Sequence, residues 1–202
     1  MIHHALRFVT ESLNTYLNQQ AGNITTPSRM VHLTNVAAGD SISIPDRSIG
    51  VSLVNIEEER VFKEQRSTVI NEYGRAEIRN PELKLNLYVL VSANFTREDG
   101  DTTEDYIEGL KQLSQVIEFF QGKNVFTNEN SPYLASLDPS IQKLIVEFYS
   151  HSFEQMYNFW SVLGGNYLPS VLYRVRLLTV QKREVLGSNN PIEKIIIKDP
   201  HL

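Results

Sequence analysis

Two long segments of the chain alternate apolar and polar residues, each with its own period. In residues 2–19 apolar side chains recur every three or four residues, which predicts an amphipathic helix that lies on a core. This stripe consists of Ile2, Leu6, Val9, Leu13, Tyr16 and Leu17. In residues 83–95 every second residue, from Leu83 to Phe95, is apolar. A period of two over that length predicts a strand at or near the centre of a sheet.

Periodicity and capping residues predict two more helices. The first covers residues 103–121, begins among acidic residues and threonines that suit a helix start, and ends before Gly122. Its predicted buried stripe consists of Tyr106, Leu110, Leu113, Ile117 and Phe120. The second covers residues 152–163, where Ser152 and Gln155 have the spacing of a capping box. Its aromatic cluster around Trp160 is expected in the core, with an interface as the second choice.

Shorter segments complete the predicted fold. Strands are predicted at residues 30–36, 49–56, 171–180 and 193–198, and at 144–149, where a short helix fits nearly as well. Residues 57–80 have no clean period and predict an extension of the preceding strand followed by a long excursion over the surface. Residues 128–139, with two prolines, predict a loop.

These elements mix strands and helices without strict β-α-β alternation, which is typical of α+β proteins. The predicted fold is a single α+β domain: a mixed or mainly antiparallel twisted sheet flanked by about three helices, at residues 2–19, 103–121 and 152–163. We expect the domain to cover residues 1–190 and residues 191–202 to form a C-terminal arm.

Charge and composition narrow the range of partners. The 202 residues include 19 basic and 24 acidic side chains, and no basic face stands out, so no nucleic acid is expected. Arg174 and Arg176 are expected on a solvated face or in ion pairs. The most apolar run, 87–91, is too short to cross a bilayer, so no membrane is expected. The absence of cysteine excludes disulfides and thiolate metal sites.

No pattern of catalytic or metal-binding residues emerges. The five histidines lack the spacing of a helical zinc site. His151 lies between two serines, but no serine has the glycine pattern of a nucleophile elbow. Glu57, Glu58 and Glu59 would point to alternating faces of an extended backbone and could not converge on one metal ion. They predict a solvated strand end or an interface rim, and we predict no catalytic residue, cofactor or metal.

Several weak motifs occur in a consistent order along the chain. They are Val51 to Arg60, Asn80-Pro81 leading into 85–90, 106–110, 119–121 with 125–126, 159–165 and 167–176. In order and spacing they resemble the cap, or tail-terminator, proteins of extracellular contractile injection systems, the particles of the antifeeding-prophage and virulence-cassette type. With the N-terminal helix the resemblance covers nearly the whole chain.

The resemblance implies a non-enzymatic structural protein. It implies a ring, a hexamer, that sits on the last layer of inner tube and sheath, stops polymerisation and anchors the sheath end. The implied partners are other copies of the chain and the sheath and inner-tube proteins. The implied location is the cytoplasm during assembly and then a phage-tail-like particle that can be released from the cell.

The residues also suggest where subunits would meet. Pro191 precedes a short β-prone arm that contains Ile195, Ile196 and Ile197, and an exposed strand of this kind should pair with something. Predicted interface residues are Glu57, Glu58, Glu59, Arg60, Ile195, Ile196 and Ile197. The alternative for the arm is an edge strand paired within its own subunit. The alternative for the protein is a peptide- or ligand-binding module without catalysis.

Overall fold

The computed structural model of the protein describes residues 1–22, 28–38, 41–59, 68–70, 75–79, 83–95, 102–162, 167–180 and 185–189. The elements of this part of the chain are, in order, α1 (Ile2–Gln20), β1 (Val31–Leu33), β2 (Ala37–Ala38), β3 (Ser41–Ile42), β4 (Ser48–Glu58), β5 (Thr68–Ile70), β6 (Ala76–Arg79), β7 (Leu83–Asn94), α2 (Thr102–Gly122), β8 (Val125–Thr127), α3 (Pro132–Leu137), β9 (Lys143–Phe148), α4 (Phe153–Val162), β10 (Ser170–Val180) and β11 (Val185–Asn189).

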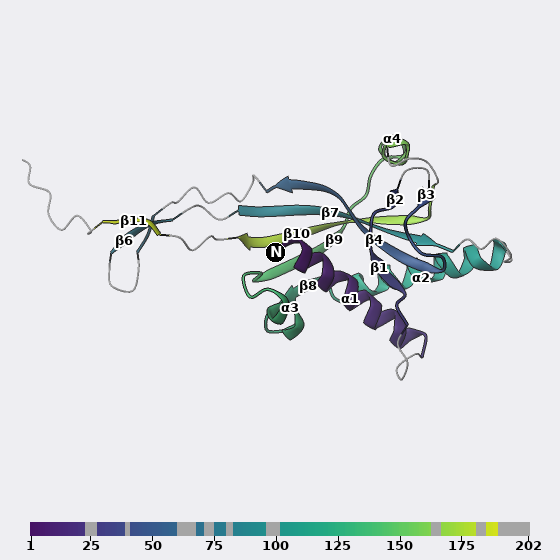
Figure 1. Cartoon of the computed structure of the whole chain (residues 1–202), viewed down its shortest axis with the longest axis horizontal. Coiled ribbons are helices and arrows are strands. Elements are labelled where there is room, and N and C mark those ends of the chain that lie inside the picture. Colours follow the sequence, from purple (N-terminus) through teal and green to yellow (C-terminus); the bar gives the residue numbers. More distant parts are fainter. Residues whose placement is uncertain are drawn as a thin grey trace, which may run out of the picture.

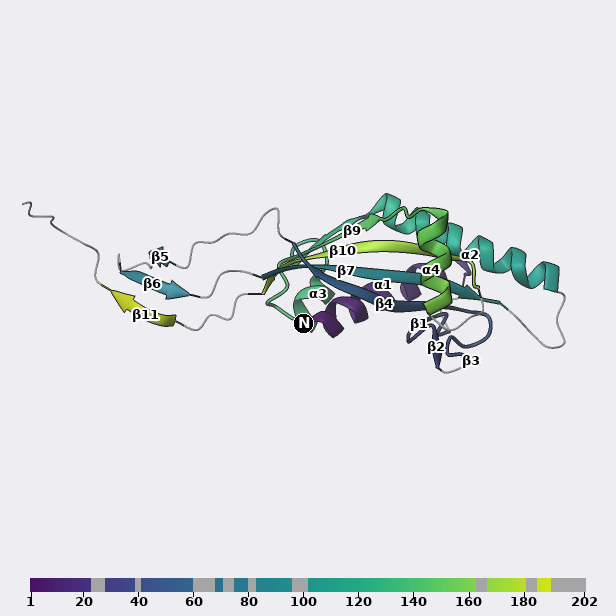
Figure 2. The same cartoon turned by 90° about the horizontal axis from the view of Figure 1, so that it is seen from above.

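A six-stranded sheet organises the molecule, with strand order β1-β4-β7-β10-β9-β8. Only the β1–β4 pair of this sheet is parallel, and the other pairs are antiparallel. The predicted central strand is β7, which lies between β4 and β10 as expected. Strands β5, β6 and β11 form a three-stranded sheet beyond the ends of β4, β7 and β10 (Figures 1 and 2).

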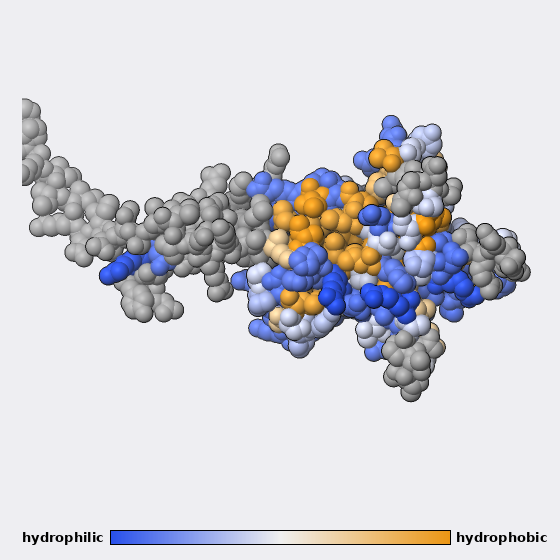
Figure 3. All heavy atoms as spheres, viewed as in Figure 1, coloured by the Kyte–Doolittle hydropathy of each residue, from blue (hydrophilic) through white to orange (hydrophobic). Residues whose placement is uncertain are grey.

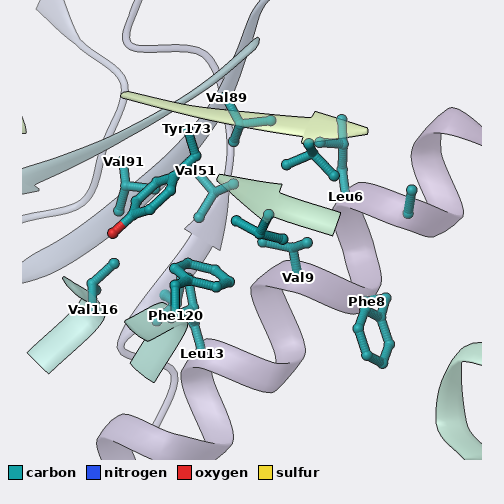
Figure 4. Packing of buried hydrophobic residues seen from close by; sticks show 14 of the residues in the cluster. Leu6, Phe8, Val9, Leu13, Val51, Val89, Val91, Val116, Phe120 and Tyr173 are labelled. Atoms are coloured by element: carbon teal, nitrogen blue, oxygen red, sulfur yellow. The ribbon is translucent and has the colours of Figure 1, made fainter. Parts of the chain in front are cut away.

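The main core lies on one face of the six-stranded sheet, here called the inner face, which α1, α2 and α3 cover (Figure 1). Strand β7 contributes the side chains from Leu87 to Ala93 at every second position, as its alternation predicts. The apolar stripe of α1 packs against them, with Leu13 and Leu17 fully buried (Figure 4 shows part of this packing). Burial of such side chains is the main driving force of folding.

The opposite face, here called the outer face, is only partly covered. Helix α4 lies over it (Figures 1 and 2), and a small cluster packs there. That cluster consists of Val36, Ile44, Leu90, Trp160, Leu168 and Leu172. The lack of a side chain at Gly50 lets Ile44 pack in this cluster, because a Cβ atom at position 50 would lie 2.4 Å from Ile44 Cδ1.

The structure confirms the α+β class, the mixed and mainly antiparallel sheet and the three predicted helices. Residues 144–149 form a strand, as the first of two alternatives predicted. The loop predicted at residues 128–139 is wrong in part, because α3 occupies its centre. Pro132 is the first residue of α3, a position where a missing N–H and a fixed φ are favourable.

The predicted buried stripe of α2 is also wrong in part. Leu113 and Phe120 are buried, but Tyr106, Leu110 and Ile117 are exposed. The helix is rotated because it approaches the sheet through Gly109, where an added Cβ atom would lie 3.2 Å from the ring of Phe95. The side that faces the sheet therefore carries Gly109 and Gln112.

Two segments differ in extent from their predictions, and a third is not tested. The strand expected at 30–36 is limited to β1, and the chain then forms the β2–β3 pair. The excursion expected at 57–80 contains β5 and β6, which pair with each other, and β6 also pairs with β11, a strand that was not predicted. The strand at 193–198 and the arm at 191–202 lie outside the described residues.

Candidate interaction surface

The uncovered half of the outer face carries polar side chains in two rows across neighbouring strands. In one row Glu57, Asn86 and Arg176 lie opposite each other on β4, β7 and β10. In the other, Tyr88 and Arg174 lie opposite each other on β7 and β10. Directly opposite residues share a face of the sheet, so these side chains form one surface, here called the polar platform.

A shift of register in β4 brings Glu57 to this surface. Leu53 pairs with Val89, but Asn55 pairs with Tyr88, so Val54 is the extra residue of a β-bulge. Such a bulge reverses which residues of a strand face which side. Before it, the odd-numbered residues of β4 face the inner core, and after it they face outward.

Hydrogen bonds link the acidic end of β4 to β7. Tyr88 donates its hydroxyl hydrogen to Glu57 Oε2 at 2.9 Å, and Asn86 Nδ2 donates to Glu59 Oε2 at 3.1 Å. Burial, followed by the hydrogen bond and the charge of Glu57, raises the pKa of Tyr88. The acidic run is thereby held against the sheet.

An ion-pair cluster occupies the other side of the platform. Arg174 donates from Nε and Nη2 to Glu147 Oε2 at 3.1 and 2.7 Å, and Arg176 Nη2 donates to Glu147 Oε1. Partial burial acts to raise the pKa of Glu147, but the hydrogen bonds and charges of the two arginines outweigh it and lower that pKa. The prediction that these arginines form ion pairs is confirmed.

The structure describes only some of the predicted interface residues. Glu57 and Glu59 lie on the platform, whereas Glu58 pairs with Leu85, so the expected alternation of faces is confirmed. Arg60, Ile195, Ile196 and Ile197 lie outside the described residues. A role of any of these residues in subunit contacts stays a prediction.

Exposed apolar side chains form two further surfaces, and they include Tyr106, Leu110, Ile117 and Tyr157, which the sequence placed first in the core. On α2 they are Tyr106, Ile107, Leu110 and Ile117. On α4 they are Phe153, Tyr157 and Val162, and Figure 3 shows apolar atoms exposed at this helix. The sequence contained a signal for α2, because Ile107 and Val116 are apolar positions outside the single predicted stripe.

An aromatic groove of about 540 Å³ lies on the inner-face side, between α1, α3, β8 and the end of α2. Its lining includes Phe8, Ser12, Thr15, Tyr16, Phe119 and Phe126. At its rim Lys123 Nζ donates to Asn130 O at 2.9 Å and to Ser131 Oγ at 3.1 Å, and lies 5.2 Å from the centre of the Phe126 ring. The groove is therefore mostly apolar with a positive edge.

The described residues bring together few of the groups that catalysis or metal binding would use. Within the ranges given above, no group of three or more His, Asp or Glu side chains could hold a metal ion. His151 lines a cavity of about 190 Å³ with mainly apolar walls, and the hydroxyl of the adjacent Ser152 accepts the N–H of Gln155 at the start of α4. None of the described helices is long and apolar enough to cross a membrane.

Comparison with known proteins identifies the family. The model of the Pvc16 N-terminal domain family matches residues 8–194, and the chain belongs to this family. No curated protein sequence matches the chain.

Solved structures share the fold. The sheath/tube terminator of the PVC extracellular contractile injection system, in its extended state, has a TM-score of 0.57 at 14% identity, with 94% of this chain and 62% of that chain covered. The tube-terminating cap of the anti-feeding prophage has a TM-score of 0.50 at 15% identity, with 93% and 60% covered. The chain spans about three fifths of the length of these solved proteins.

Proposed function

We propose that the protein is a structural cap that terminates the inner tube and sheath of a contractile injection particle. The observation that carries the proposal is the fold: almost the whole chain aligns with solved proteins named as a sheath/tube terminator and a tube-terminating cap. Membership of the Pvc16 N-terminal domain family supports the same role.

The cap acts as a ring of identical copies, a hexamer, on the last layer of the particle. Its partners are other copies of the chain and the sheath and inner-tube proteins. A terminator must match the growing end on one face and offer nothing to add to on the other. The polar platform and the exposed apolar side chains of α2 and α4 are among the surfaces available for such contacts.

The role requires no catalysis. A cap stops polymerisation and anchors the sheath end by shape and surface complementarity, without making or breaking a bond in a substrate. The protein assembles with the particle in the cytoplasm and leaves the cell as part of it.

Electron microscopy of particles from cells that lack the protein tests the proposal. A missing cap should give tails of uncontrolled length or sheaths that detach, and expression of the intact chain should restore a narrow length distribution. Particles of normal length with a stable sheath in the deletion strain would refute the cap function.

The predicted C-terminal arm has its own test. Deletion of residues 191–202 should weaken capping and leave the fold of residues 1–190 intact, because the arm would add a strand to a neighbouring subunit or to the sheath. Tail lengths are counted for the truncated and intact chains, and circular dichroism checks the fold. Unchanged ring formation and normal tail lengths with the truncated chain would refute this role of the arm.

A further inference from the structure

Helix α4 is attached by one edge and presents apolar side chains to solvent. Trp160 is its only buried residue, while Phe153 is 80% exposed and Tyr157 is 69% exposed. These two aromatic residues are one helical turn apart, so they lie on the same side of the helix. Large apolar side chains with this degree of exposure mark a surface that another molecule covers.

A capping box gives α4 a defined start. Ser152 N donates to Gln155 Oε1 at 2.9 Å, and Gln155 N donates to Ser152 Oγ at 3.2 Å. The two bonds satisfy N–H groups that a helix start otherwise leaves unpaired. The exposed aromatic side chains are therefore presented on a formed helix that is anchored to the outer face through Trp160.

The aromatic groove offers a complementary surface. The rings of Tyr16 and Phe119 lie 5.1 Å apart, and the Phe119 and Phe126 rings stack at 6.2 Å. Further aromatic rings would extend this arrangement at favourable centre-to-centre distances. Ser12 and Thr15 of α1 are small side chains in the lining and leave space for them.

The two surfaces cannot meet within one copy. Helix α4 lies on the outer face, and the groove is built from α1, α2, α3 and β8 on the inner-face side, with the sheet between them (Figures 1 and 2). A contact between them must join two copies. Because it uses two different surfaces, it is a head-to-tail contact, and repetition of such a contact with the right rotation closes a ring.

The charges of the two surfaces also match. Helix α4 carries Glu154 on its exposed side and no basic residue. Of the charged groups that line the groove, Glu11 is paired with Arg29 at 3.2 Å, whereas Lys123 is held by neutral groups. The groove thus presents a net positive edge to an acidic helix.

We propose that α4 of one copy docks Phe153 and Tyr157 into the aromatic groove of the next copy, with Glu154 beside Lys123. The proposal rests on the proposed function, since it supplies the contact between neighbours in the ring.

Cysteine cross-linking tests this contact directly, because the natural chain contains no cysteine. The variant carries Thr15→Cys in the groove and Asn158→Cys beside Tyr157 on α4, both exposed positions. Particles assembled with it are oxidised and analysed on a non-reducing gel. A ladder of covalent oligomers up to the size of the ring is expected.

The matched control carries Ser114→Cys with Asn158→Cys. Ser114 is exposed on α2 and lies outside the groove lining, so this chain should stay monomeric. Capped particles of normal length whose Thr15→Cys/Asn158→Cys chains remain monomeric would overturn the contact alone. If the control pair gave the ladder and the test pair did not, the partner of α4 would be the exposed side of α2. This result would also overturn the contact with the groove. Absence of the protein from particles would overturn the proposed function itself.

A charge exchange provides a second measurement. Glu154→Lys and Lys123→Glu should each reduce the fraction of capped tails, and the double variant should restore it, while circular dichroism melts verify that every chain folds. Equal capping by all three variants and the natural chain would contradict the pairing of these two residues.

Discussion

Replacement of Gly50 by alanine is expected to destabilise the protein through a single crowded contact on the outer face. The new Cβ atom would lie 2.4 Å from Ile44 Cδ1 and 2.5 Å from Ile44 Cγ1. Carbon atoms in contact normally lie about 3.5–4.0 Å apart, so the isoleucine must move by about 1 Å. It has little room to do so, because its side chain is 2% exposed.

The expected loss is about 1–3 kcal/mol, the usual range for an extra methyl group in a packed core. Alanine is otherwise better than glycine in a strand by roughly 0.5–1 kcal/mol, which reduces the loss without cancelling it. Ile44→Ala alone should cost about 2–5 kcal/mol, because it opens a cavity.

The double variant separates crowding from other effects. Ile44→Ala removes the atoms that collide with the new methyl group, so the double variant should lose less stability than the sum of the two single losses, by about 0.5–3 kcal/mol. Urea unfolding followed by circular dichroism gives the free energies. Gly122→Ala is the control, since nothing lies within 4 Å of a Cβ atom there. A Gly50→Ala variant as stable as the natural chain, or strictly additive losses, would refute the argument.

Three further predictions concern polar contacts. Ser152→Ala removes one bond of the capping box and should cost about 0.5–2 kcal/mol, seen as faster hydrogen exchange in α4; unchanged exchange would contradict it. Glu147→Gln should cost about 1 kcal/mol at neutral pH, because its arginine pairs are partly exposed, and the loss should shrink in high salt; a loss that salt does not change would contradict the ionic origin. Hydrogen bonds from Ser140 and His4 outweigh burial and lower the pKa of Asp138. Its ionised form therefore contributes stability above its unfolded pKa of about 3.9, and that stability is lost as the pH falls below this value. In the Asp138→Asn variant the urea midpoint should fall less between pH 6 and pH 2 than in the natural chain, and an equal fall in both chains would contradict this prediction.

The sequence predicted the fold best in segments where a regular apolar pattern extends over many consecutive residues. The alternation in residues 83–95 gave the central strand, and the three- and four-residue spacing in residues 2–19 gave the helix that covers its inner face. The capping box at Ser152 and Gln155 is likewise a local pattern, and the structure has both of its hydrogen bonds. In these segments each residue's preference agrees with the final fold.

The missed features depend on contacts between distant segments. The rotation of α2 depends on the fit of Gly109 against Phe95, which periodicity cannot reveal because both sides of this helix carry apolar residues. Helix α3 has six residues, too few for a period to show. Strand β11 is defined only by its pairing with β6, more than one hundred residues earlier in the chain.

The candidate interaction surface was likewise predictable only where it depends on local sequence. The acidic run at Glu57 could be assigned to an exposed strand end, but its partners on β7 and the bulge that turns it outward required the structure. The pairing of α4 with the aromatic groove could not be inferred from sequence, because its two halves lie on opposite faces of one sheet.

Cryo-electron microscopy of the particle end, with the tube and sheath still assembled, is the decisive test of the cap function. The expected image is a ring of copies of this chain on the last layer of tube and sheath, with α4 of each copy against the groove of its neighbour. An intact particle whose end lacks this chain would contradict the cap function.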